Sequence, residues 1–272
     1  MRTRYWRTAA GLLMTAVMLF PVYWMVVVSL TPARDMRKSP PSLFPASPTL
    51  EGYERVLREQ LPYFATSLLV ALGTVVLTLA LAAPAAYALA KLWPAGRRAF
   101  GFGFVLLVAQ MIPGIIMALG FYGIYVRLGI TNTVWGLVLA DSTVAVPFAV
   151  LVLTAFMASV PDELLQAARI DGAGPWRAFV SVVLPASRNG VITAALFSFL
   201  WAWSDFLFAA TLDSGGALQP LTLGIYRYIG NNNQEWNSIM ATAVVASVPA
   251  SVLLVVAQRF VAAGLTSGAV KD

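Results

Sequence analysis

The chain has 272 residues, of which 59% are hydrophobic and only 11% are charged, and its mean hydropathy is +0.77. Soluble domains carry charged residues at about 25% of positions, so this composition indicates an integral membrane protein. The sequence contains no cysteine and no histidine, which excludes disulfides, the usual zinc sites, thiol nucleophiles and imidazole acid–base chemistry, and so argues against an enzyme. The net charge of +6 suits the cationic loops of a membrane protein. The sequence shows no basic stripe with interleaved aromatic residues, which argues against nucleic-acid binding.

Six apolar segments are each long enough to cross a bilayer, for which about 20 residues are needed. The first follows three arginines, as in a signal peptide, but it is longer than the roughly 7–15 apolar residues of such a peptide, which indicates a retained span. We therefore predict an all-α integral membrane protein with six transmembrane helices. They cover residues 9–30, 65–90, 100–126, 134–157, 190–212 and 239–261, with polar connections at 31–62, which holds a short helix near 50–59, and at 213–237.

Prolines occur inside four of these segments, at Pro84, Pro113, Pro147 and Pro249. Each removes a backbone hydrogen bond and permits a kink, and Pro113 with its flanking Ile and Gly is expected to break the third span. One interpretation is a set of hinges around a translocation cavity. The other, which we favour slightly, is the ordinary tolerance of proline in membrane helices.

The distribution of lysine and arginine predicts the orientation. With a cytoplasmic N-terminus, seven of the 18 cationic residues lie outside, five of them in the long segment 31–62, where the rule counts less. Both termini are then cytoplasmic, and the chain divides into an N-terminal span with an external loop (1–64), a transmembrane core (65–261) and a cytoplasmic tail (262–272). The other eleven lie inside: Arg2, Arg4, Arg7, Lys91, Arg97, Arg98, Arg169, Arg177, Arg188, Arg259 and Lys271.

Residues 159–185, between the fourth and fifth spans, form the longest stretch on the predicted cytoplasmic side that is typical of soluble, folded structure; we call it the knob. Ser159 suits the N-cap of a helix, and Asp162 and Glu163 favour the positive end of that helix. Gly172 suits its C-terminal end. We therefore predict a short, capped cytoplasmic helix that connects two spans.

A second short helix can begin at Pro175, which makes the knob a helical hairpin. One interpretation is an amphipathic hairpin on the lipid surface, but such a helix carries a basic polar face opposite bulky apolar residues. The first helix of the knob is instead acidic at its start and presents the small Ala167 and Ala168. Because small residues permit close approach of a second helix, we interpret the knob as a contact for a groove in another protein.

The knob resembles the coupling-loop signature of bacterial ABC importer permeases, Glu-Ala-Ala, three residues and Gly, in the stretch Gln166-Ala167-Ala168-Arg169-Ile170-Asp171-Gly172-Ala173. The rest of the sequence is similar to the carbohydrate branch of these permeases, the maltose-type second permease subunit. The matching stretches are 29–32, 40–45, 48–53, 85–90, 96–98, 203–208, 258–260 and 264–271, so the resemblance covers essentially the whole chain.

The resemblance implies a permease subunit of a binding-protein-dependent type I importer for a sugar, in the bacterial plasma (inner) membrane. Its implied partners are a second homologous permease, a dimer of ATPase subunits and an extracytoplasmic sugar-binding protein. ATP and Mg would be bound by the ATPase, since this chain lacks a Gly-rich phosphate loop and so carries no cofactor of its own. The coupling residues implied are Gln166, Ala167, Ala168, Asp171, Gly172 and Ala173, and residues 264–272 are a further expected ATPase contact.

The first glutamate of the family signature is Gln166 in this chain. A charge-assisted contact to the ATPase would thereby become a neutral hydrogen bond of about half the strength. Glu163 lies three residues earlier on the same helix face. We therefore predict that Glu163 supplies part of the missing electrostatic contact.

Asp205 is the main candidate for a substrate contact within the membrane, because an ionised side chain in a span costs about 2.5–3.5 kcal/mol and usually faces a polar cavity or partner. With Trp201, Trp203 and Phe206 it resembles a sugar-contact surface, where aromatic faces stack on sugar rings and a carboxylate accepts hydroxyl protons. The alternative is a structural carboxylate with interfacial aromatic residues beside it. Asp141 in the fourth span has the same two interpretations.

Three other functions remain open at this point. A stand-alone secondary transporter or channel would be expected to show inverted repeats or several intramembrane charges. An ABC permease for a non-sugar solute, such as a peptide or polyamine, would share the knob but not the stretches that resemble the carbohydrate branch. A membrane-embedded enzyme is disfavoured by the missing histidine and cysteine. The loop residues 231–233 and Trp236 are alternative contacts, for the binding protein.

Overall fold

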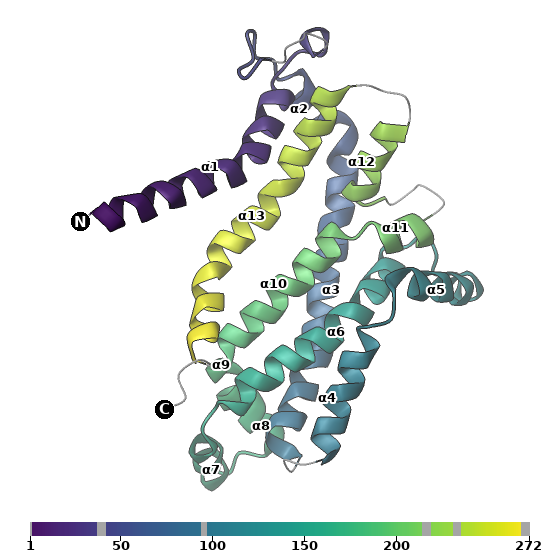
Figure 1. Cartoon of the computed structure of the whole chain (residues 1–272). Helices are drawn as coiled ribbons and strands as arrows, with labels where there is room; N and C mark the ends of the chain where they lie inside the picture. The colour runs from purple at the N-terminus through teal and green to yellow at the C-terminus, as the bar shows by residue number, and fades with distance from the viewer. Residues whose placement is uncertain (1, 37–41, 94–96, 214–218, 231–234, 268–272) are drawn as a thin grey trace. The chain divides into compact units, whose positions relative to one another are not determined.

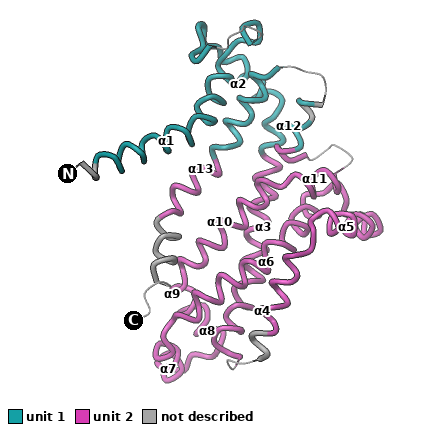
Figure 2. Tube along the Cα trace, in the orientation of Figure 1, with its two compact units in different colours: residues 1–64, 223–248 teal, residues 65–222, 249–272 magenta. Residues whose placement is uncertain are grey.

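The computed structural model describes residues 2–36, 42–93, 97–213, 219–230 and 235–267, and every regular element in those ranges is helical. The chain forms two compact units, coloured separately in Figure 2. Unit 1 contains residues 1–64 and 223–248, and unit 2 contains residues 65–222 and 249–272. Helix is the expected state of such apolar segments, because only a helix satisfies all its backbone hydrogen bonds without water or a neighbouring strand.

Four helical stretches among the described residues are long and apolar enough to cross a membrane: Tyr5–Ser29, Glu51–Leu92, Val134–Ala158 and Trp236–Gln258. Two bent pairs bring the number to six if each pair forms one span. These pairs are Gly101–Ala109 with Gly114–Leu128, bent by 85°, and Pro175–Ala186 with Arg188–Ser204, bent by 79°. The predicted all-α membrane architecture is confirmed.

Unit 1 contains α1 (Arg2–Ser29), the short helix η1 (Ala33–Asp35) and α2 (Glu51–Arg55), which continues through a π-helical turn, Val56–Gln60, into α3 (Leu61–Tyr87). Most of α12 (Leu221–Gly230) and the first part of α13 (Trp236–Ser267) complete the unit. The sequence prediction placed no helix within 213–237, so α12 is an element that it missed. Residues 231–233 and the end of the predicted tail, 268–272, lie outside the described residues.

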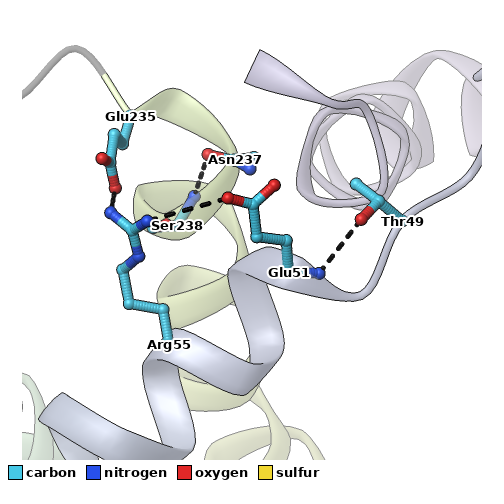
Figure 3. A network of polar contacts seen from close by, with 6 residues as sticks. All are labelled: Thr49, Glu51, Arg55, Glu235, Asn237 and Ser238. Carbon is cyan, nitrogen blue, oxygen red and sulfur yellow. Dashed lines mark hydrogen bonds and ion pairs between the residues drawn. The ribbon is translucent and has the colours of Figure 1, made fainter. Parts of the chain in front are cut away.

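A polar network joins α2 to the start of α13 (Figure 3). Arg55 forms ion pairs with Glu51, at 3.8 Å, and with Glu235. Gly52 lies so close to α13 that a Cβ atom there would come within 2.9 Å of the Asn237 carbonyl oxygen. The network therefore holds the two helix starts of unit 1 together.

Unit 2 is built around α6 (Val134–Ala158) and α10 (Arg188–Ser204), which lie side by side (Figure 1). The side chain of Thr133 caps α6 by accepting a hydrogen bond from the Gly136 amide at 3.0 Å. Between α3 and α6 lie α4 (Arg97–Ala109) and α5 (Gly114–Leu128); between α6 and α10 lie α7 (Asp162–Ile170), α8 (Pro175–Ala178), a π-helical turn (Phe179–Val183) and α9 (Leu184–Ala186). The short α11 (Leu207–Leu212) follows α10.

The four span prolines have different structural consequences. Pro113 lies at the predicted break, where α4 ends and α5 begins in a new direction. Pro84, Pro147 and Pro249 instead lie inside continuous helices. The predicted fifth span, 190–212, is not one helix, because α10 ends at Ser204 and the chain is extended at the next residue before α11 begins.

Close packing of α6 on α10 depends on Gly190. A Cβ atom at this position would lie 2.6 Å from Cγ of Phe156 and 2.7 Å from its Cβ, so one of the two helices must shift to admit it. We expect Gly190→Ala to destabilise the protein by about 1–3 kcal/mol through overpacking, measured as a lower thermal unfolding temperature in detergent. Gly123→Ala is the matched control, because nothing lies within 4 Å of a Cβ atom there. Equal unfolding temperatures for the two variants would contradict this packing.

Candidate functional site

The first helix of the knob is α7, and its C-terminal end follows the predicted pattern. Gly172 has φ +79°, in the left-handed region that favours glycine. Its amide donates to the Arg169 carbonyl at 3.0 Å, and the amide of Ala173 donates to the Ala168 carbonyl at 2.9 Å. These two bonds form a Schellman motif, which satisfies carbonyl groups that a helix end otherwise leaves without partners.

The start of α7 differs from the prediction. Ser159 is the C-terminal cap of α6, and its hydroxyl donates back to the Phe156 carbonyl at 2.7 Å. The residue before α7 is Pro161, which has no side chain able to accept a hydrogen bond. The prediction that Ser159 caps the knob helix is therefore wrong, because the backbone of α6 competes successfully for its hydroxyl.

A π-helical turn that follows α3, Ala88–Leu92, supplies the anchor that the start of α7 lacks. Lys91 donates from Nζ to the Val160 carbonyl at 2.6 Å and pairs with Oδ1 of Asp162 at the same distance. The Lys91 side chain is only 6% exposed, whereas that of Asp162 is 73% exposed. The Lys91 side chain is thus buried, and of its two partners the Val160 carbonyl belongs to the backbone while the Asp162 side chain is open to solvent.

One helical turn before Lys91, Tyr87 holds the second part of the knob. Its hydroxyl donates to the Pro175 carbonyl at 3.2 Å, and its ring lies 5.0 Å from that of Phe179. Leu165 of α7 and Phe179 both enter the buried core that α3 and α6 share. Sequence reasoning missed Tyr87 and Lys91, since nothing in their local pattern indicates partners about 70 to 90 residues further along the chain.

The outer face of the knob is open. Among the predicted coupling residues, Ala168 and Ala173 are half-buried, and the exposed ones are Glu163, Gln166, Ala167, Asp171 and Gly172. The knob also leaves large apolar side chains uncovered, above all Ile170 on α7 at 87% and Trp176 on α8 at 67% exposure. Such residues are typical anchors of protein–protein interfaces.

A second candidate site is a cavity of about 510 Å³ within unit 2, at the breaks between α4 and α5 and between α10 and α11. Trp201, Asp205 and Phe206 of the predicted substrate group line it. Trp203 does not: it is buried and stacks on Phe199 with 5.5 Å between ring centroids. Trp201 and Trp203 are two residues apart on α10, about 200° around the helix, so they face opposite sides. The sequence alone did not show which of these two sides faces the cavity, because that depends on the packing of the neighbouring helices.

The Asp205 carboxylate has a structural role in this cavity wall. Its Oδ1 accepts from the Phe208 amide at 3.2 Å and its Oδ2 from the Ala209 amide at 3.0 Å, so it caps the N-terminus of α11. Its carbonyl accepts from the Thr222 hydroxyl at 2.6 Å. Asp141 lies outside the cavity, 1% exposed on α6, and its carboxylate makes no hydrogen bond to any residue that the structure describes.

Comparison with known proteins places the chain in a family. Residues 82–267 match the family described as binding-protein-dependent transport system inner membrane component, and the chain belongs to that family. The chain is therefore the inner-membrane permease subunit of an ABC importer, and not itself an enzyme.

Similar proteins include the trehalose transport system permease protein SugB of Mycobacterium tuberculosis, which is 35% identical over 99% of this chain and 98% of its own length. The diacetylchitobiose uptake system permease protein DasC of Streptomyces coelicolor is 31% identical over 98% of this chain and 97% of its own. Among solved structures, a bacterial ABC transporter involved in the import of the acidic polysaccharide alginate matches with a TM-score of 0.79 and 20% identity, over 94% of this chain and 96% of that one.

We expect Lys91→Met to loosen the start of the knob, because the Val160 carbonyl and the Asp162 carboxylate both lose their donor. Loss of a hydrogen bond to a charged group costs about 1.5–3 kcal/mol, so amides of Asp162–Ile170 should exchange with deuterium about tenfold faster or more. Asp162→Asn is the control: its amide oxygen can still accept from the Lys91 Nζ, and the side chain that loses its charge is 73% exposed, so the exchange should change by about twofold or less. Unchanged exchange in Lys91→Met would contradict the anchor.

Proposed function

We propose that the chain forms half of the translocation path of a sugar importer and that its knob couples this path to ATP hydrolysis in partner ATPase subunits. The observation that carries the proposal is the geometry of the knob: the short helix α7 is closed by a Schellman motif, is anchored by Lys91 and presents Ile170 to solvent, and α8 presents Trp176. An unpartnered face of this kind favours a protein groove as its binding site.

The physical basis of coupling is stiffness. Tyr87 at the end of α3 and Lys91 in the π-helical turn after it tie both parts of the knob to this segment, and Leu165 packs into the core beside α6. A force applied to the exposed face therefore acts on packed helices and does not dissipate in a loop. When the ATPase subunits close on ATP, the knob would move and carry the attached spans with it.

The proposed assembly contains this chain, a second homologous permease, two ATPase subunits and an extracytoplasmic sugar-binding protein. The family description, with its reference to binding proteins, supports the last of these partners. The charge distribution supports cytoplasmic termini and a cytoplasmic knob, because most cationic residues then lie inside.

A sugar is the substrate class that best fits the relatives and the cavity. The similar proteins SugB and DasC are named for trehalose transport and diacetylchitobiose uptake. In this chain, the exposed aromatic rings of Trp201 and Phe206 line a cavity within the range of about 300–1,000 Å³ that is common for ligand sites. Aromatic faces of this kind can stack on the apolar face of a sugar ring.

The coupling role is tested by purifying this chain with its ATPase and comparing Gly172→Asp and Ala168→Arg with the wild type. Asp at Gly172 must adopt a positive φ, and Arg at Ala168 places a bulky cation beside the contact face. We expect each variant to lose the ATPase, or most of the substrate-stimulated ATP hydrolysis, while the thermal unfolding temperature stays close to that of the wild type. Normal binding and coupling in both variants would remove the knob from the proposed mechanism.

The charge of the knob face is tested separately. Glu163 and Gln166 are both exposed on α7, so either position can present a carboxylate to the ATPase. We expect Glu163→Gln to weaken ATPase binding by about threefold to tenfold, and Gln166→Glu to restore it when the two changes are combined. The affinity is measured at two salt concentrations, because a charge contact weakens as ionic strength rises. If Glu163→Gln alone leaves both affinity and transport unchanged, Glu163 does not replace the missing glutamate.

A further inference from the structure

The cavity at the helix breaks adjoins a second one. The second cavity, of about 200 Å³, lies between α6 and α10, beside the rings of Phe148 and Phe197, whose centroids are 5.1 Å apart. Three residues line both cavities: Gln110, Val144 and Trp201. These three side chains therefore form a shared wall.

The direction from one cavity to the other is the same on both helices. On α6 the lining advances from Val144 to Phe148, and α6 ends at the knob. On α10 it retreats from Trp201 to Phe197, and α10 begins just after the knob. The second cavity thus lies one helical turn nearer the knob, about 5.4 Å along each helix. At about 200 Å³ it is below the usual size of a ligand site, so the path narrows beyond the shared wall.

The chemistry of the larger cavity indicates the charge of its ligand. Asp205 is the only charged side chain among the described residues that line it, and no cation balances an anionic ligand there. The Asp205 carboxylate is held by two amides of α11. The Thr143 hydroxyl donates to the Ala140 carbonyl at 2.6 Å, and the Ser204 hydroxyl donates to the Leu200 carbonyl at 2.8 Å. The lone pairs of both hydroxyl oxygens can therefore accept hydrogen bonds from a ligand.

We propose that Gln110, Val144 and Trp201 form the selectivity constriction of the path and that it passes uncharged sugars and rejects acidic ones. Trp201 stacks on the sugar ring, Val144 sets the width, and the Gln110 amide, with two donors and an acceptor, pairs with sugar hydroxyls. Asp205 is then a positioning residue that fixes the break between α10 and α11. This inference rests on the proposed sugar-import function and names the residues that select within it.

The Gln110 side chain suits this role because of its place in the fold. It follows the last residue of α4, in the non-helical break before α5, and it is exposed to the cavity. Irregular backbone at membrane depth is tolerated where it is buried in protein or lines a water-filled cavity. Because the amide carries no charge, it can bind a sugar hydroxyl without adding the cost of an unpaired ion to the path.

The first test uses the absence of cysteine from this chain, which lets a single introduced thiol report alone. This chain, carrying Gln110→Cys or Val144→Cys, is reconstituted in liposomes as part of the complete transporter with its binding protein. We expect a small hydrophilic methanethiosulfonate reagent to label both positions. Trehalose, maltose and diacetylchitobiose are compared, and the neutral sugar that stimulates ATP hydrolysis most is used for protection. We expect this sugar to slow the labelling at least threefold. Leu153→Cys, at 0% exposure, is the unlabelled control. Labelling without protection by the stimulating sugar would overturn the constriction.

The second test compares substrates in transport. Gln110→Leu should raise the KM for the stimulating neutral sugar about threefold to tenfold, the cost of one lost hydrogen bond, and Gln110→Asn should recover part of the loss. Val108→Leu, two residues earlier and outside both cavities, is the matched control. Stimulation by glucuronic or galacturonic acid, but by none of the neutral sugars, would overturn the selectivity. If no sugar of either class stimulates ATP hydrolysis in a complex that does respond to a peptide or polyamine, the sugar-import function itself fails.

Discussion

The requirement that buried backbone groups find hydrogen-bond partners in lipid controls where this protein can be irregular. In unit 2 the described spans are interrupted between Ala109 and Gly114 and again between Ser204 and Leu207. Both interruptions line the same cavity. Asp205 supplies acceptors to the amides freed at one of them. The broken spans and the cavity that they line are thus one feature, since the irregular backbone lies only where it faces this cavity.

The knob solves a different problem, which is how a short helix outside the hydrophobic core becomes rigid. A nine-residue helix is unstable alone, because isolated helices shorter than about 12–15 residues are marginal in water. Here α7 gains stability from three sources: the Schellman bonds at Gly172, the burial of Leu165 and the bonds from Lys91. The Leu165 and Lys91 side chains are buried and so lie away from the exposed face. That face is therefore free to carry residues chosen for a partner.

Residue patterns predicted the elements better than they predicted the contacts. The six apolar segments, the break at Pro113 and the glycine stop at Gly172 follow from local rules of length, missing amides and positive φ. The role of Ser159 and the faces of Trp201 and Trp203 did not follow, because two acceptable alternatives differ only in tertiary neighbours. Lys91 could not be assigned at all, since its partners lie about 70 residues further along the chain.

The two sites of unit 2 are joined by the same pair of helices. α6 runs from beside the cavity to the knob, and α10 runs back from the knob to the cavity wall. Gly190 of α10 approaches Phe156 of α6 closely near the knob ends of both helices, so the two pack tightly there. Gln110 belongs to neither helix and lies in the break after α4. In the proposed coupling, a displacement of the knob would change the shared wall chiefly by moving the α6–α10 pair relative to Gln110, because only Gln110 of the three wall residues lies outside that pair.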